Sequence, residues 1–452
     1  MPTKTKPTVR PTPVDAVSPP SSDSPVLTPA DFVPSSLTGW IGVVGFILGV
    51  ISLNKYEAIG QQLLHRAVGL PRYWEGLAIM AFTSLPMLVC DSILLRRRAR
   101  QTGESTTRPP SYSVGRTVTK LVGLLGSVVL LGFLYWIFPE YFPSLQPDSG
   151  FYSNFFSLCR AVAPWAVVGC AAYFFVIDAR LSEPYDGYWY FGRVILLNFR
   201  DVDWAKVRNH LRTWAVKGFF MPLMFTYLCD NLPGLIYRGW PDFLTGFHYF
   251  HNFLFTIDLA FVSCGYVLTL RWVQSHVRSA EPTALGWTAA LMCYMPFWKM
   301  IGDLYLGYWG DNSWDRWINP GQPLLYLWGG AILFFETIFV WATISFGLRF
   351  SNLTHRGIVR TGPYYFTKHP AYISKIIAFL LIAVPWLDSR GLEQSVRNCL
   401  MLSGLAFIYW IRARTEERHL SSIDATYAVY ANEVRQRHRR WFRPLTGLFG
   451  KA

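Results

Sequence analysis

The sequence predicts an all-α, polytopic integral membrane protein with about ten transmembrane helices. Two properties of the chain support this prediction. Apolar residues make up 52% of the 452 residues and charged residues only 15%, whereas soluble domains carry about 25% charged residues. The apolar residues also gather into long blocks, and roughly 20 residues of low polarity suffice to cross a bilayer as a helix. This pattern excludes a secreted protein, a fibrous repeat and a chain that is disordered throughout.

Residues 1–36 are predicted to form a disordered tail. They are rich in Pro, Ser and Thr and hold few large apolar side chains, so they bury too little surface to offset the entropy of ordering. No short apolar segment follows the first charges, and a cleavable signal peptide is therefore not expected. The membrane-embedded part is expected to begin near Leu37.

Each apolar block after the tail is predicted to be one transmembrane helix. The blocks are 38–54, 73–95, 118–138, 158–178, 214–237, 249–271, 284–305, 322–347, 371–388 and 395–411. We group the first seven into an N-terminal bundle, residues 37–320, whose role the sequence does not indicate. Residues 321–452 are predicted to form a second module that carries the polar motifs and a basic C-terminal tail.

The basic residues predict how the chain crosses the membrane. Lys and Arg concentrate in alternate connections, namely 96–120, 180–217, 271–278, 349–368 and the tail after residue 411. Basic loops stay on the cytoplasmic side, so both termini are expected in the cytoplasm, with a bacterial inner membrane as the expected location. The net charge of +14 is explained by this topology, and no nucleic-acid partner is expected. The seven Cys residues fall in or beside apolar blocks without a CxxC pair, so no metal site is predicted from them.

Polar motifs with a specific spacing appear after residue 346. The chain reads FGLRFSNLTHRGIVRTGPYYFTKHPAYIS and, after two apolar spans with a short turn between them, YWIRARTEERHLSSIDATYAVYANEV. This arrangement resembles the isoprenylcysteine carboxyl methyltransferase and phospholipid methyltransferase superfamily of integral membrane enzymes. In that superfamily a Gly-x-Tyr-x-x-x-Arg-His-Pro-x-Tyr segment opens a helical hairpin and an Arg-x-x-x-Glu-Glu segment follows it. The resemblance covers about residues 345–435, and Lys368 stands where the family has Arg.

The resemblance implies a methyltransferase that uses S-adenosyl-L-methionine and acts on a membrane lipid or lipidated substrate. The acceptor group would be a carboxylate, an amine or a hydroxyl. The candidate cofactor-binding residues are Tyr364, His369, Pro370, Tyr372, Arg412, Arg414, Glu416 and Glu417. The candidate catalytic residues are His369, Arg414 and Glu417, and the candidate substrate-binding residues are Glu336, Tyr427 and Tyr430. If the acceptor needs a base, His369 or Glu417 is the first choice.

These residue types suit the chemistry of the cofactor. Arg holds a carboxylate through two hydrogen bonds and Glu can take an ammonium, while Tyr rings offer faces to adenine and to the sulfonium cation. On a helix Arg412 and Glu416 share one face, as do Arg414 and Glu417. Each of these features also has a purely structural explanation. Arg/Glu pairs at helix ends are commonly surface salt bridges, and a His-Pro pair often only marks a helix start.

Charged residues inside apolar blocks are further candidates, because they are costly in a membrane. They are Asp258, Lys299, Asp303, Glu336 and Lys375. Glu336 either orients a polar substrate group or pairs with Lys299 or Lys375. The basic run RQRHRRWFR near the C-terminus is expected to bind anionic lipid headgroups. Two other functions stay open, an NADPH-dependent membrane reductase of the sterol-reductase type and a non-enzymatic lipid-binding or transport protein.

Overall fold

The computed structural model describes residues 36–64, 70–101, 111–137, 150–181, 183–236, 239–311 and 313–449. These residues are helical almost throughout, which confirms the all-α prediction. The strands found among them are β1 (Ser279–Ala280) and β2 (Thr354–His355), which pair antiparallel. The predicted tail lies outside the described residues, apart from its last residue.

Among the residues that the structure describes, six helices are long and apolar enough to cross a membrane. They are α1 (Ser36–Leu64), α2 (Arg72–Gln101), α3 (Val114–Ile137), α4 (Ser153–Asp178), α7 (Phe243–Val267) and α11 (Pro323–Phe346). Only 6% of the apolar stretch of α4 is buried within the protein, and Trp165 in its middle is 78% exposed. Soluble proteins rarely expose a continuous apolar surface of this extent, so these helices support a multi-pass membrane protein.

The predicted count of about ten spans is wrong for the described residues. The block 284–305 forms two short helices, α8 (Ala284–Leu291) and α9 (Phe297–Leu304), because the chain turns between them and α9 starts again after Pro296. At 14 residues, α12 (Pro370–Ala383) extends about 21 Å, less than the roughly 30 Å of a bilayer core.

The other two predicted spans are long helices that carry many charges. They are α6 (Trp204–Asn231) and α13 (Leu392–Ile423). Lysines and arginines occupy the first half of α6, and the RARTEER sequence lies in the second half of α13. Hydropathy identified the apolar residues of these four blocks correctly. It did not indicate where a helix breaks within a block or where a helix continues into charged sequence.

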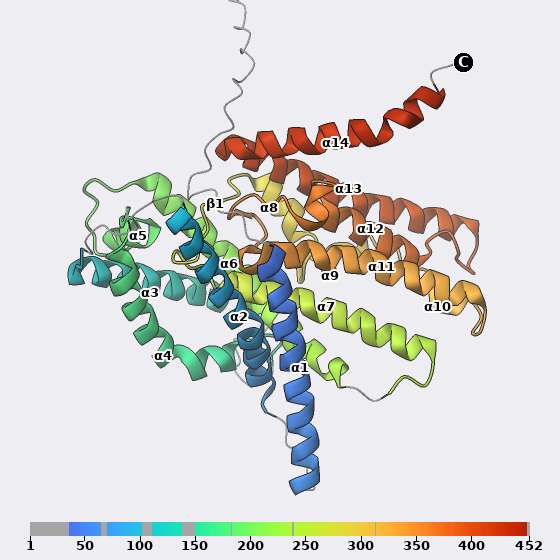
Figure 1. Ribbon diagram of the computed structural model, residues 1–452, viewed down its shortest axis with the longest axis horizontal. Coiled ribbons are helices and arrows are strands. Elements are labelled where there is room, and N and C mark those ends of the chain that lie inside the picture. Colours follow the sequence, from blue (N-terminus) through green and yellow to red (C-terminus); the bar gives the residue numbers. More distant parts are fainter. Residues whose placement is uncertain are drawn as a thin grey trace, which may run out of the picture.

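The remaining elements are short helices and one long C-terminal helix. They are α5 (Gly187–Ile195), η2 (Leu232–Leu235), α10 (Trp314–Trp317), η3 (Gly347–Arg349), η4 (Gly362–Tyr365) and α14 (Ala425–Phe449). In Figure 1, α3, α4 and α5 lie on one side of the molecule, while α7, α11, α12 and α13 extend to the other. Helix α14 lies at the edge, beside α13.

The helices α1 and α2 pack unusually closely, because α1 carries glycines at the contact. A Cβ atom on Gly45 would lie 2.1 Å from the carbonyl oxygen of Phe82, and one on Gly42 would lie 2.6 Å from Met87 Sδ. Such small residues let two membrane helices approach backbone to backbone.

A single hydrophobic cluster joins the two parts of the chain predicted from the sequence. It includes Phe46 of α1, Phe220 of α6, Phe261 of α7 and Ile344 of α11. Because α11 begins after residue 320, the cluster crosses the predicted boundary at that position. The second part of the chain is therefore packed on the first through a shared core.

Candidate functional site

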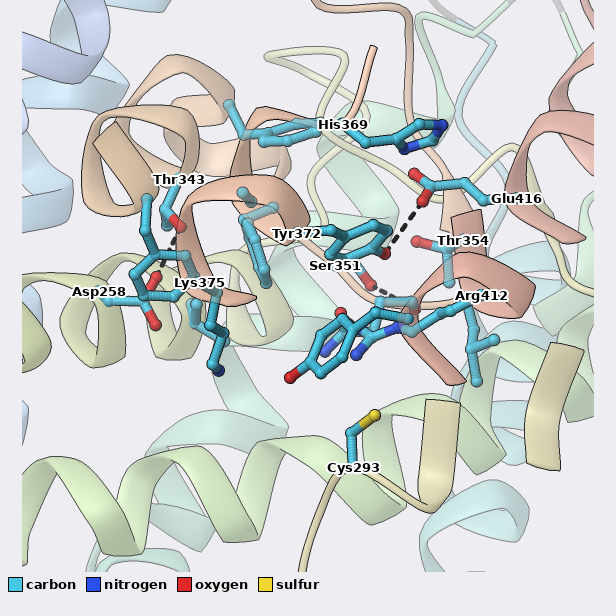
Figure 2. Close-up of a pocket in the computed structure, with 18 of the residues that line it drawn as sticks. Asp258, Cys293, Thr343, Ser351, Thr354, His369, Tyr372, Lys375, Arg412 and Glu416 are labelled. Carbon is cyan, nitrogen blue, oxygen red and sulfur yellow. Dashed lines mark hydrogen bonds between the residues drawn. The ribbon is translucent and has the colours of Figure 1, made fainter. Parts of the chain in front are cut away.

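A cavity of about 310 Å³ lies among α7, α11, α12 and α13, within the range of about 300–1,000 Å³ typical of small-molecule sites. Five of the predicted cofactor-binding residues line it, namely Tyr364, His369, Tyr372, Arg412 and Glu416. Figure 2 shows Arg412 and Glu416 at one side, Asp258, Thr343 and Lys375 at the other, and Tyr372 between them. We call these the Arg412 end and the Asp258 end of the cavity.

Two helices bring the predicted motifs to this cavity. Pro370 is the first residue of α12, where its missing N–H would have no partner in any case. The rings of His369 and Tyr372, which flank this helix start, stack with centroids 5.6 Å apart. On α13, Arg412 and Glu416 are one helical turn apart and both line the cavity, which confirms the prediction that they share a face.

The guanidinium of Arg412 is buried among polar and aromatic groups. Its side chain is buried, and Nη2 donates to Asn352 Oδ1 at 2.6 Å. The rings of Tyr294, Tyr372 and Tyr409 surround it with centroids at 5.5, 5.2 and 5.8 Å. In the described part of the chain no carboxylate lies within ion-pair distance of Arg412. A buried cation without an anion is costly, so this is a favourable place for an anionic ligand group.

The loop between η3 and η4 places Asn352 beside Arg412. Asn352 also donates from Nδ2 to the Tyr294 hydroxyl at 3.1 Å. The loop itself is held by Arg356, whose buried guanidinium donates to the carbonyl oxygens of Gly265 at 2.8 Å and Phe350 at 2.9 Å. The position of Asn352 is therefore fixed by contacts with α7 and with the loop backbone.

An acidic group lies at the same end of the cavity. Glu416 is exposed at the mouth, and its Oε2 accepts a hydrogen bond from the Tyr372 hydroxyl at 3.0 Å. Glu281 and His419 also line this end. The Arg412 end thus combines a buried cation with carboxylates, which suits a ligand that carries both a carboxylate and an ammonium.

Arg414 and Glu417 do not line this cavity. Glu417 instead accepts from His369 Nε2 at 2.8 Å, pairs with Lys368, and lies 3.6 Å from Arg414 Nη1. Burial raises the pKa of Glu417, but the hydrogen bonds from His369 and Lys368 outweigh it and lower the pKa to about 2. The predicted shared face of Arg414 and Glu417 is confirmed, and it faces away from the cavity. We call these four side chains the outer ion cluster.

The three predicted substrate-binding residues also lie away from the cavity. Tyr427 and Tyr430 of α14 pack with Ile358 and Tyr364, and the Tyr430 hydroxyl donates to the Tyr364 carbonyl oxygen at 2.9 Å. They hold the turn that carries Tyr364 into the cavity wall.

The intramembrane Glu336 pairs with a residue that the sequence did not suggest. Its Oε1 lies 2.7 Å from His251 Nδ1, so neither predicted partner, Lys299 or Lys375, makes the ion pair. Lys375 instead lines the main cavity, as does Asp258.

Sequence reasoning missed several lining residues. Tyr294, Asn352 and Tyr409 complete the surroundings of Arg412. Asn352 and Tyr409 lie in the two stretches that resemble the superfamily but outside its spaced motifs, and Tyr294 lies outside both stretches. Tyr294 lies in a block that was taken for one continuous span. Pro296 within that block was the available signal that the chain turns there.

The fold and the cavity together define a helical membrane protein with a cavity among α7, α11, α12 and α13 that polar and apolar side chains line. Comparison of the chain with family models, with curated proteins and with solved structures finds no match.

Proposed function

We propose that the protein is an integral membrane methyltransferase that uses S-adenosyl-L-methionine to methylate a lipid-like or membrane-associated acceptor. The observation that carries this proposal is the buried Arg412, which is ringed by three tyrosines and has no carboxylate partner among the described residues. The cofactor has a carboxylate that would complete this arginine, together with a sulfonium and an aromatic base that suit tyrosine faces.

The Arg412 end would hold the amino-acid part of the cofactor. Arg412 would take its carboxylate, and Glu416 at the mouth would take its ammonium. The Tyr372 hydroxyl bonds Glu416 and its ring lies 5.2 Å from the Arg412 guanidinium, so one side chain orients both charges. Transfer would be an in-line displacement at the sulfonium methyl, for which the protein mainly positions and desolvates the two reactants.

The acceptor would come from the bilayer. The six apolar helices support a multi-pass protein, and we propose a bacterial inner membrane with both termini in the cytoplasm. Helix α14 exposes Arg435, Arg439 and Arg440, which would contact anionic lipid headgroups on that side.

Cofactor binding is the direct test of this function. Purified protein in lipid nanodiscs should bind S-adenosyl-L-methionine in calorimetry, and NADPH should give no heat above background. Binding of NADPH alone would replace the proposal with a membrane reductase. Binding of neither compound would favour a lipid-binding or transport protein.

A further inference from the structure

We infer that the Asp258 end of the cavity is the acceptor site and that it takes a neutral hydroxyl group, which becomes a methyl ether. This inference rests on the proposed function and deepens it. It arises from three side chains on three different helices, Asp258 on α7, Thr343 on α11 and Lys375 on α12, which line the cavity opposite Arg412 (Figure 2).

Asp258 presents one carboxylate oxygen to the protein and leaves the other available. The side chain is 8% exposed, and its Oδ1 accepts a hydrogen bond from Thr343 Oγ1 at 2.5 Å. Among the described residues no hydrogen-bond donor is found for Oδ2. Asp258 lines the cavity, so a protic ligand group that enters there can donate a hydrogen bond to Oδ2.

Lys375 supplies the complementary charge without neutralising Asp258 by contact. Its Nζ lies over the rings of Phe339 and Phe379, 5.0 and 5.7 Å from their centroids. In the described part of the chain it forms no ion pair within contact distance, although it attracts Asp258 electrostatically. Charges inside membrane helices are expensive and commonly mark functional sites. Here two opposite charges face one cavity but do not touch.

The pair of charges selects the class of acceptor. A carboxylate would be repelled by Asp258, and it needs no base. An amine would be held by Asp258 in its protonated form, which is not nucleophilic, and Lys375 would repel it. A neutral hydroxyl donates its hydrogen to Asp258 Oδ2, while a second oxygen on the same headgroup accepts from Lys375 Nζ.

Methyl transfer from the cofactor to the hydroxyl needs no reactant besides these two and no base besides Asp258. The hydroxyl oxygen forms a bond to the methyl carbon as the carbon–sulfur bond breaks, and the electron pair of that bond stays on sulfur. The hydroxyl proton moves to Asp258, which acts as the general base, and it leaves later to water through the cavity mouth. The products are a methyl ether, the neutral thioether form of the cofactor and one proton.

The chemical linkage of the product tests the inference without any mutation. Native membranes that contain the protein are incubated with S-adenosyl-L-methionine labelled in its methyl group, and the lipids are extracted. We expect labelled lipid that survives mild alkali and is not retained by a cation exchanger. Label released as methanol by alkali would indicate a methyl ester, and retained label would indicate a methylated amine. Either result would overturn the hydroxyl assignment.

Variants locate the acceptor site. Asp258→Asn and Lys375→Met should each lower transfer by about 100-fold, with cofactor affinity within about twofold of wild type. Thr343→Val should have a smaller effect of about tenfold. Its matched control is Thr337→Val on the same helix, whose hydroxyl donates to the Leu333 carbonyl at 2.7 Å and which should leave transfer unchanged.

Different results would contradict the proposed function and the proposed acceptor site. Wild-type protein that does not bind the cofactor contradicts the proposed function. Wild-type protein that binds the cofactor but labels no lipid, or an Asp258→Asn variant that transfers at the full rate, contradicts the acceptor site alone.

Discussion

Residues 412–417 of α13 contribute both to the Arg412 end of the cavity and to the outer ion cluster, and the two groups have opposite character. Arg412 is buried, with no carboxylate partner in the described ranges, and Glu416 is exposed at the mouth. Arg414 is 54% exposed, and Glu417 contacts Lys368, His369 and Arg414. A helix rotates by about 100° per residue, so neighbours in the sequence are divided between a ligand site and a protein surface.

This difference shows how to separate binding groups from structural ones. The carboxylate of Glu417 already has protein partners on both oxygens, so a ligand would have to displace them. The guanidinium of Arg412 lines a cavity and has no counter-charge within contact distance in the part of the chain that the structure describes. Buried polar groups that the protein leaves incompletely satisfied indicate a ligand site more strongly than charged motifs that are fully paired.

The largest expected effect on cofactor affinity is that of replacing Arg412, and the comparison is with replacement of Arg414. Arg412→Ala should weaken binding of S-adenosyl-L-methionine by at least about 30-fold, because removal of one partner of a buried charged pair costs about 2–5 kcal/mol. Arg414→Ala should change the affinity by less than about threefold, since that side chain is mostly exposed. Calorimetry on both proteins measures the difference.

The buried arginine also stabilises the fold, so a milder variant is needed beside it. Arg412→Lys keeps the charge but loses the planar donor fork, and it should bind the cofactor with intermediate affinity. Equal losses for Arg412→Ala and Arg414→Ala would mean that the cavity and the outer ion cluster act as one site.

An intermediate effect is expected for Tyr372→Phe, which removes the hydrogen bond to Glu416 at 3.0 Å and keeps the ring. Hydrogen bonds to charged groups contribute about 1.5–3 kcal/mol, and the mouth is partly hydrated, so a loss of about tenfold in cofactor affinity is expected. Tyr365→Phe is the matched control, because Tyr365 is 48% exposed and does not line the cavity. Unchanged affinity for Tyr372→Phe would remove Glu416 from the cofactor site.

The smallest effect is expected for Glu417→Gln, which addresses the outer ion cluster. It should lower the melting temperature at pH 7 by about 1–2 °C and leave cofactor affinity unchanged. Because folding lowers the pKa of Glu417 from 4.5 to about 2, its stabilisation is complete above the unfolded value and is lost as the pH falls towards the folded value.

The difference in melting temperature between wild type and Glu417→Gln should therefore shrink between pH 5 and about 3. A constant difference over that range would show that the charge of Glu417 contributes nothing to folding. A loss of cofactor affinity in this variant would instead bring the outer ion cluster into the binding site.

Local features of the site were predictable from the sequence, and long-range ones were not. Helix geometry alone predicts that Arg412 and Glu416 lie on one face of α13. The contribution of Asn352 depends on how Arg356 anchors its loop to α7, which no local pattern encodes. Asp258 and Lys375 were recognisable as unusual intramembrane charges, but their meeting at one cavity required the packing of α7 against α11 and of α11 against α12.

The same limits apply to the fold. The blocks at α3, α4, α7 and α11 were long, apolar and uninterrupted, and each became a helix that can cross a membrane. The block 284–305 was equally apolar, but it contains a turn before Pro296. Hydropathy measures the environment that a segment prefers, whereas the path of the backbone also depends on its contacts.

The exposed middle of α4, residues 163–169, has a consequence for how this chain tolerates change. Residues 163–169 of α4 are all exposed, so their side chains are expected to meet lipid hydrocarbon, which accepts any apolar group. Substitution of Val168 by Leu, Ile or Phe should be neutral in a saturation scan. Gly45, where a single methyl group would strike the Phe82 carbonyl, should accept no replacement. Selection on α4 then acts on average hydropathy, and its sequence is free to drift faster than that of α1.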